Sequence, residues 1–143
     1  MQIRTLKFIG LACLIFLGAG LLVHFLRPHY GRCDFYNHPD TLDGGVKLLN
    51  GLSYRFQICG TGGNDQDGTD DEIELKVFND KETLLARRYF SVNWYGGRSF
   101  HKPLTYEADV VRYIDVAEDS GFYKALNIPP TKWDWIQARL PLF

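Results

Sequence analysis

The stretch that decides the fold reads Glu72-Ile73-Glu74-Leu75-Lys76-Val77-Phe78, in which polar and apolar side chains alternate. Successive side chains of a β-strand point to opposite faces of its sheet, so this period of two places the apolar residues on one face. Residues 54–58 alternate in the same way. We therefore predict two strands, each with one face against a hydrophobic core.

The residues that follow predict a β-hairpin. Residues 79–82 have the polar composition of a turn, and residues 84–92 read as the returning strand. Arg87 and Arg88 in its middle indicate a strand that lies at a sheet edge or carries polar side chains on both faces. A further strand is predicted at residues 110–116.

The C-terminal part favours helix over strand. Residues 122–126 are predicted to form one helical turn. Thr131 and Asp134 have the spacing of a capping box, in which a hydroxyl and a carboxylate bond the free amides at a helix start. Trp133 and Trp135 are two apart, so only one of them can face the core from a helix, and we expect the other to face outward.

Together these patterns predict a mainly β domain of the α+β type. It is either an antiparallel β-sandwich or a curved sheet, completed by a short C-terminal helix and preceded by an N-terminal transmembrane or signal helix. With 143 residues, of which 45% are hydrophobic, the chain can bury one core.

The N-terminal helix is predicted from an apolar run of nineteen residues that begins at Phe8 and ends at Leu26, after Arg4 and Lys7. About twenty apolar residues span the hydrocarbon core of a bilayer as a helix. Two interpretations remain open: an uncleaved signal anchor, or a signal peptide cleaved after the small residues 18–20. The apolar run continues beyond residue 20, which favours the anchor.

The cysteines indicate the compartment. Cys13 lies in the apolar run, so Cys33 and Cys59 are the pair left in the rest of the chain. A disulfide between them would contribute about 3 kcal/mol of stability and would persist in an oxidising compartment, whereas two separate buried thiols are the alternative. We expect the bridge, and with it a single-pass inner-membrane protein whose C-terminal domain lies in the periplasm. The chain then divides into a signal anchor or signal peptide (1–26), a juxtamembrane link (27–32) and a periplasmic β-rich domain (33–143).

Residues 60–74 contain six carboxylates and no basic side chain. Carboxylate oxygens are the ligands that Ca²⁺ takes, and the candidate calcium ligands are Asp65, Asp67, Asp70 and Asp71. The EF-hand pattern fails at Gly63, where an Asp is needed. We favour a solvated acidic loop over a calcium site, and no other cofactor is expected. A third interpretation is that the loop meets a basic surface of a partner.

Aromatic residues make up 15% of the chain, and two of them, Trp94 and Tyr95, stand close to Arg98 in a segment that reads as a loop. Trp, Tyr and Arg dominate the energetics of protein interfaces. We therefore predict a partner-binding surface made by Trp94, Tyr95 and Arg98 together with the aspartates of residues 65–71. Core packing and anchoring at the membrane interface are the other uses of such aromatic residues.

Residue usage argues against several function classes. Beyond residue 26 the chain has 14 basic and 17 acidic side chains, which disfavours binding to nucleic acid. No histidine or cysteine spacing matches a zinc site, and no serine lies in a nucleophile motif. No catalytic residue is predicted, and we expect a binding protein rather than an enzyme.

Two stretches, residues 72–94 and residues 128–141, resemble small, signal-anchored proteins of Gram-negative bacteria that have no assigned function. In size, anchor and location the chain is also similar to the immunity partners of antibacterial toxins. This resemblance implies a membrane-anchored periplasmic protein that neutralises a toxin by occlusion, and it implies no active site. The alternatives are an accessory or structural subunit of a cell-envelope complex, and a calcium-dependent envelope enzyme or binding module.

Overall fold

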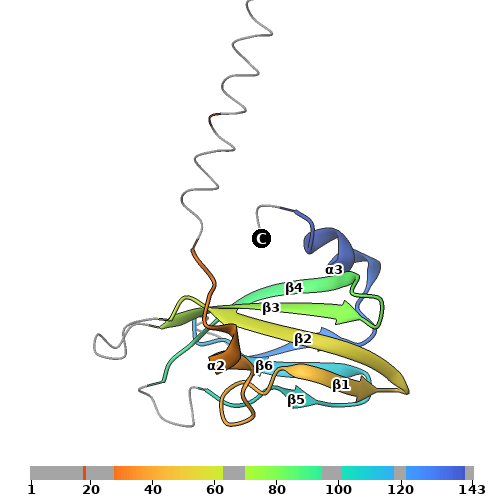
Figure 1. Ribbon diagram of the computed structural model, residues 1–143, viewed down its shortest axis with the longest axis horizontal. Helices are drawn as coiled ribbons and strands as arrows, with labels where there is room; N and C mark the ends of the chain where they lie inside the picture. Colours follow the sequence, from red (N-terminus) through yellow and green to blue (C-terminus); the bar gives the residue numbers. More distant parts are fainter. Residues whose placement is uncertain (1–17, 19–27, 63–69, 95–100, 118–121, 141–143) are drawn as a thin grey trace, which may run out of the picture.

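The structure is a computed structural model that describes residues 18, 28–62, 70–94, 101–117 and 122–140. Its elements, in chain order, are α2 (Cys33–Asn37), β1 (Gly45–Leu49), β2 (Leu52–Gly60), β3 (Asp71–Asn79), β4 (Leu84–Val92), β5 (Thr105–Tyr106), β6 (Val110–Ile114), β7 (Tyr123–Asn127) and α3 (Lys132–Gln137) (Figure 1). The fold is mainly β, as predicted. Strands β1–β4 form the first sheet in sequence order, β5–β7 form the second sheet, and both are antiparallel.

The alternating stretch forms β3, and the predicted strands on either side of it are confirmed as β2 and β4. Val77 of β3 pairs with Phe56 of β2 and with Ala86 of β4, and all three side chains are fully buried. The period of two thus produces a continuous apolar row across three strands. The strand predicted at residues 110–116 is also confirmed, as β6.

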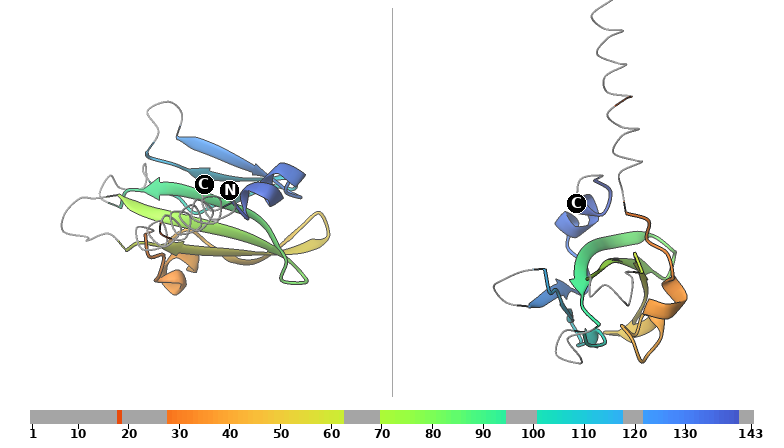
Figure 2. Two further views of the ribbon diagram at one scale, coloured as in Figure 1. Left: turned by 90° about the horizontal axis from the view of Figure 1, so that it is seen from above. Right: turned by 90° about the vertical axis from the view of Figure 1, so that its left-hand side faces the viewer.

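The two sheets share one hydrophobic core, and the first sheet curves towards the second (Figure 2). Core side chains come from α2 and from both sheets, and they include Tyr36, Phe56, Ile73, Leu75, Val92, Val111 and Leu126. At one side the Ser91 amide donates to Asp115 Oδ1 at 3.0 Å, and the Val116 amide donates to the Ser91 carbonyl at 3.0 Å. These bonds attach β4 to the segment that follows β6.

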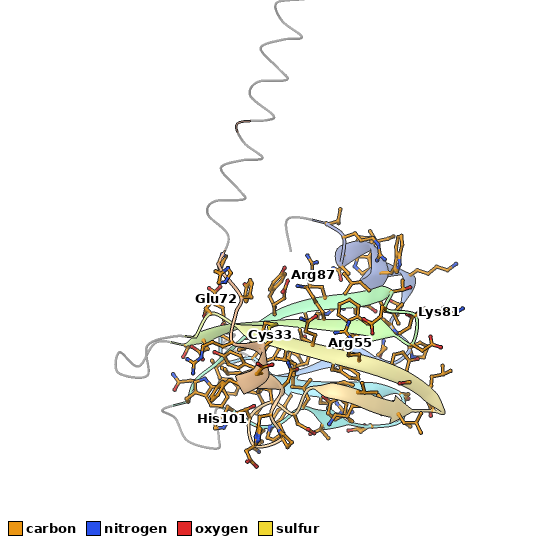
Figure 3. All side chains as sticks on the ribbon, viewed as in Figure 1. Cys33, Arg55, Glu72, Lys81, Arg87 and His101 are labelled. Atoms are coloured by element: carbon orange, nitrogen blue, oxygen red, sulfur yellow. A yellow bond between two sulfur atoms is a disulfide. The ribbon has the colours of Figure 1, made fainter. Side chains whose placement is uncertain are left out.

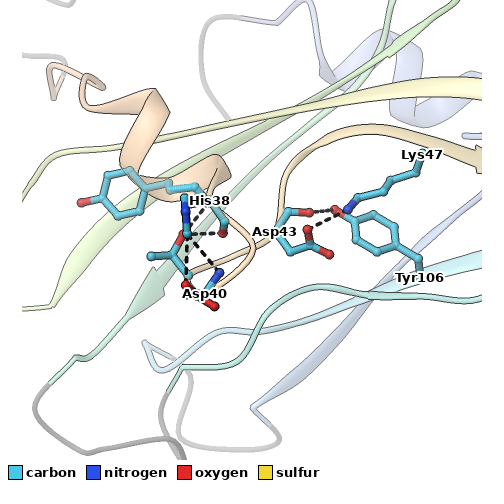
Figure 4. Close-up of polar contacts among 7 residues, drawn as sticks. His38, Asp40, Asp43, Lys47 and Tyr106 are labelled. Carbon is cyan, nitrogen blue, oxygen red and sulfur yellow. Dashed lines mark hydrogen bonds and ion pairs between the residues drawn. The ribbon is translucent and has the colours of Figure 1, made fainter.

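A second junction joins the segment before β1 to β5 (Figure 4). The Tyr106 hydroxyl donates to the Asp43 carbonyl at 2.6 Å, and the Lys47 ammonium donates to the Asp43 carboxylate at 2.7 Å. The same ammonium lies 4.8 Å from the centre of the Tyr106 ring. Burial raises the pKa of Tyr106, so its hydroxyl stays protonated and remains a donor.

The prediction of a helical turn at residues 122–126 is wrong, because this segment forms the strand β7. Leu126 pairs with Val111 of β6 and is buried against the core, while Tyr123 pairs with Ile114. A short run with few apolar residues is ambiguous by its pattern, and pairing with β6 decides in favour of the strand.

The helix predicted from its capping box is confirmed as α3, with Thr131 and Asp134 bonding each other's amides. The expectation that Trp133 or Trp135 packs in the core is wrong, because their side chains are 62% and 45% exposed. The helix packs on β4 through polar contacts instead, and the residues that it buries are Asp134 and Ala138.

None of the helices within the described ranges is long and apolar enough to cross a membrane. The apolar run from Phe8 to Leu26 lies outside the described residues, except for Gly18.

Candidate binding surface

The two segments predicted to bind a partner leave the first sheet at the same end. Strands β3 and β4 are antiparallel, and Asp71 at the start of β3 pairs with Val92 at the end of β4. Asp70, just before β3, and Asn93 and Trp94, just after β4, are therefore neighbours. Helix α2 lies at this end too, and Cys33 and His101 mark it, whereas Lys81 lies at the opposite end of the domain (Figure 3).

Asp71 connects these segments through its carboxylate. Its Oδ2 accepts a hydrogen bond from the Tyr36 hydroxyl at 2.6 Å and another from Trp94 Nε1 at 2.7 Å. Asp71 is 3% exposed, and Tyr36 is fully buried. Burial, followed by the hydrogen bond to Asp71, raises the pKa of Tyr36, so its hydroxyl remains a donor. The Gly62 amide donates to the same hydroxyl at 3.2 Å.

An aromatic cluster surrounds this carboxylate. Phe35 packs edge-on against Tyr36 and Trp94, with ring centres 5.1 and 5.6 Å apart. The His101 ring lies 4.1 Å from Trp94, and the Arg32 guanidinium lies 4.9 Å above the Phe35 ring. Residues 32–36, Asp71 and the pair Trp94 and His101, three parts of the chain that are distant in the sequence, thus contribute to one cluster.

A disulfide and hydrogen bonds from the Asn37 side chain to the backbone hold α2 against β2 beneath the cluster. Cys33 and Cys59 form the predicted disulfide, which joins α2 to β2. The Asn37 side chain accepts from the Ile58 amide at 3.0 Å and donates to the Ile58 carbonyl at 3.2 Å, as a neighbouring strand would. Gly60 has no room for a side chain, because an added Cβ would collide with the Tyr36 ring.

We define the loop-end surface as Arg32, Phe35, Asp70, Trp94 and His101. Arg32 and Asp70 are exposed, Phe35 is 42% exposed, and Trp94 and His101 are half-buried. The Asp70 carboxylate accepts a hydrogen bond from the Asn93 amide group at 2.6 Å. Beside His101 lies a cavity of about 530 Å³ that is also lined by Pro39, Asp40, Lys102 and Pro103.

The residues predicted to bind a partner fall into three groups. Asp65, Asp67, Tyr95 and Arg98 lie outside the described residues. Asp70 and Trp94 lie on the loop-end surface. Asp71 differs from the prediction: it is buried, and its carboxylate organises the cluster from within instead of facing a partner.

The candidate calcium ligands are only partly placed. Asp71 already accepts two hydrogen bonds, so it would have to lose at least one of them to coordinate an ion through Oδ2. Within residues 28–62, 70–94, 101–117 and 122–140, no group of three or more His, Cys, Asp or Glu is arranged to hold a metal.

Sequence reasoning missed Phe35 and Tyr36. Their one signal is indirect: residues 35 and 36 follow Cys33 closely, so a disulfide to β2 has to bring them to the sheet. His101 follows Trp94 by seven residues in the sequence, and its ring packs against the indole.

Comparison with known proteins does not assign this surface, because no family model, curated protein or solved structure matches the chain.

Proposed function

We propose that this chain is a membrane-anchored periplasmic binding protein whose loop-end surface contacts a protein partner. In the specific form of the proposal, the partner is a secreted antibacterial toxin that is neutralised by occlusion. The apolar run from Phe8 to Leu26 serves as the anchor.

The observation that carries this proposal is the pair of hydrogen bonds from Tyr36 and Trp94 to the buried Asp71. They hold aromatic and charged side chains in place before any partner arrives. Binding then loses less conformational entropy, because the contact residues are already ordered. Trp94 and Arg32 of the loop-end surface belong to the residue types that contribute most to interfaces.

Site-specific photo-crosslinking tests where the partner binds. A photoreactive amino acid replaces Asp70 on the loop-end surface of the full chain, and in a matched variant it replaces Asp80, an exposed residue of the β3–β4 turn. We expect position 70 to crosslink to a protein in the producing cell and position 80 not to do so. Absence of a crosslink at 70, or equal crosslinking at both positions, would contradict the proposal.

A growth assay tests whether the partner is a toxin. The chain is produced together with the periplasm-directed products of genes beside its own, and we expect it to restore growth against one of them. Asp70→Lys should abolish this protection because it reverses a charge in the contact, while Asp80→Lys should retain it. Protection that is unaffected by Asp70→Lys would place the contact elsewhere.

A second candidate, a structural subunit of an envelope complex, is favoured by an apolar patch on the first sheet. Val46, Leu48 and Leu52 are 67%, 74% and 58% exposed. Exposed apolar patches mark interaction sites. Exchanging residues 8–26 for an unrelated anchor should abolish the function of a subunit that is assembled through its membrane helix, whereas a tethered binder should tolerate the exchange.

A further inference from the structure

Helix α3 and the residues that follow it present apolar side chains to the outside of the domain. Trp133, Trp135, Ile136 and Leu140 are 62%, 45%, 42% and 37% exposed. A surface helix of a soluble domain usually turns its apolar side chains to the core and its polar ones to water. Here the arrangement is reversed.

The reversal follows from how the helix is attached. Asp134 forms an ion pair with Arg88, and the Arg139 guanidinium donates to the Leu84 carbonyl at 3.0 Å. The helix therefore covers the outer edge of β4 through its polar groups. Its apolar groups are left for a surface outside the domain.

The chain enters the domain on this same side. Gly31 and Gly60 exchange two backbone hydrogen bonds, of 2.9 and 3.0 Å, and the Tyr30 ring lies 5.5 Å from that of Tyr89 on β4. A depression of about 330 Å³ beyond Tyr89 is lined by Arg87, Arg88 and Gln137 of α3. Figures 1 and 2 show the entering chain and α3 on the same side of β4.

This attachment limits how far the domain can lie from a membrane. Four peptide steps separate Leu26, the end of the apolar run, from Tyr30, and they span at most about 14 Å when extended. The headgroup layer on each side of a bilayer is itself about 5–7 Å thick. Because Gly31 is paired with Gly60, an apolar run that enters a membrane up to Leu26 would bring the α3 side of the domain close to that membrane.

The charges on this side suit an anionic lipid surface. Around α3 and the adjoining parts of β3 and β4, five basic side chains stand against three carboxylates, on a domain that is acidic overall. Lys76 and Arg87 pair with Glu74, and Arg88 pairs with Asp134, so the excess of positive charge on this side is two. The basic residues are Lys76, Arg87, Arg88, Lys132 and Arg139, and the acidic ones are Glu72, Glu74 and Asp134. Basic side chains beside exposed Trp and Leu are the composition of helices that lie in a membrane interface.

We propose that Trp133, Trp135, Ile136 and Leu140 enter the headgroup layer of the bilayer and hold the domain on the membrane surface. Indole rings are enriched at this depth because they have an apolar body and a polar N–H. The inference rests on the proposed anchor, and it adds a second, peripheral contact. His101 of the loop-end surface lies on the side of the sheets opposite the entering chain (Figure 3).

Quenching of tryptophan emission by brominated lipid tests this contact. The full chain is reconstituted into vesicles of phosphatidylethanolamine and phosphatidylglycerol, with or without lipid brominated near the top of the acyl chain. We expect the bromine to quench much of the emission. A variant with Trp133→Phe and Trp135→Phe, in which Trp94 alone emits, should lose most of this quenching. The control variant with Val46→Ser and Leu48→Ser, which removes the other exposed apolar patch, should keep it.

Flotation of the same vesicles separates the two proposals. Protein that floats with the vesicles and is quenched supports both. Protein that floats but is not quenched overturns the contact of α3 with lipid and leaves the anchor intact, so that α3 would face a protein instead. Protein that does not float overturns the proposed anchor and, because that contact rests on the anchor, the contact of α3 with lipid as well. Near-ultraviolet circular dichroism of each variant checks that a loss of quenching does not reflect unfolding.

Discussion

Asp71 Oδ2 accepts hydrogen bonds from two residues that lie 35 and 23 positions away in the sequence. A buried carboxylate is unfavourable unless hydrogen bonds compensate its lost hydration. Tyr36 and Trp94 provide that compensation, and they are at the same time the aromatic side chains of the cluster. The stability of the domain and the shape of its loop-end surface therefore depend on the same three residues.

We predict that Tyr36→Phe and Trp94→Phe each lower the free energy of unfolding by about 1–3 kcal/mol, because each removes a donor from a buried carboxylate. Both donors act on one oxygen, so the double variant should depart from additivity by about 0.5–3 kcal/mol. Urea denaturation measures all three variants. Tyr123→Phe, at a 67% exposed position, is the control and should change stability by no more than about 0.5 kcal/mol. Strict additivity would show that the two bonds are independent.

At the scale of the element, α3 differs from an ordinary surface helix because polar contacts attach it. Burial alone would raise the pKa of Asp134, but hydrogen bonds from Thr131 and Arg88 outweigh this effect and lower it. The carboxylate is thus charged in the folded state, where it both caps the helix and binds β4. One side chain therefore links the start of α3 to the first sheet.

The lowered pKa of Asp134 predicts a loss of stability in acid. A carboxyl whose pKa is depressed by folding stabilises the folded state above its ordinary value of 3.8, and this contribution is lost as the pH falls through the lower, folded value. We expect the free energy of unfolding to fall over that interval and Asp134→Asn to flatten the fall. Urea denaturation at a series of acidic pH values measures the free energy of unfolding of both proteins. Asp80→Asn, which removes an exposed carboxylate from a turn, is the control, and an equal flattening there would refute the assignment to Asp134.

On the scale of the whole molecule, the disulfide, the Gly31–Gly60 pairing and the packing of Tyr30 on Tyr89 lie close together on the side where the chain enters the domain. Burial, followed by the charge of Glu72, raises the pKa of Tyr30 to about 12, so this ring remains neutral at its contact with β4. Together they fix the direction from which the chain enters the domain.

The disulfide gives a test of both stability and compartment. The double variant Cys33→Ala with Cys59→Ala, or reduction of the disulfide, should lower the free energy of unfolding by about 3 kcal/mol. The reason is that the bond closes a loop and so lowers the conformational entropy of the unfolded chain. Thiol labelling of denatured protein taken directly from cells should modify Cys13 alone. Cys13→Ser should then leave no reactive thiol, and its stability should still respond to reductant. Labelling of all three cysteines in the wild type would place the domain in a reducing compartment.

Local patterns in the sequence determined strands β2, β3, β4 and β6 and the start of the last helix. Alternation over residues 72–78 sufficed for β3 because side-chain direction in a strand depends only on the backbone period. The capping box at Thr131 sufficed for α3 because both of its partners lie within one turn. The Cys33–Cys59 pair was also predictable, since these are the two cysteines outside the apolar run.

Only the tertiary structure decided what surrounds each element. Residues 123–127 became a strand because β6 offered them backbone partners, and Asp71 became buried because Tyr36 and Trp94 converge on it. Trp133 and Trp135 face outward because Arg88 attaches the opposite side of their helix. Hydrophobicity predicts which side chains favour leaving water. It does not predict which surface receives them, because that surface is built by residues far away in the chain.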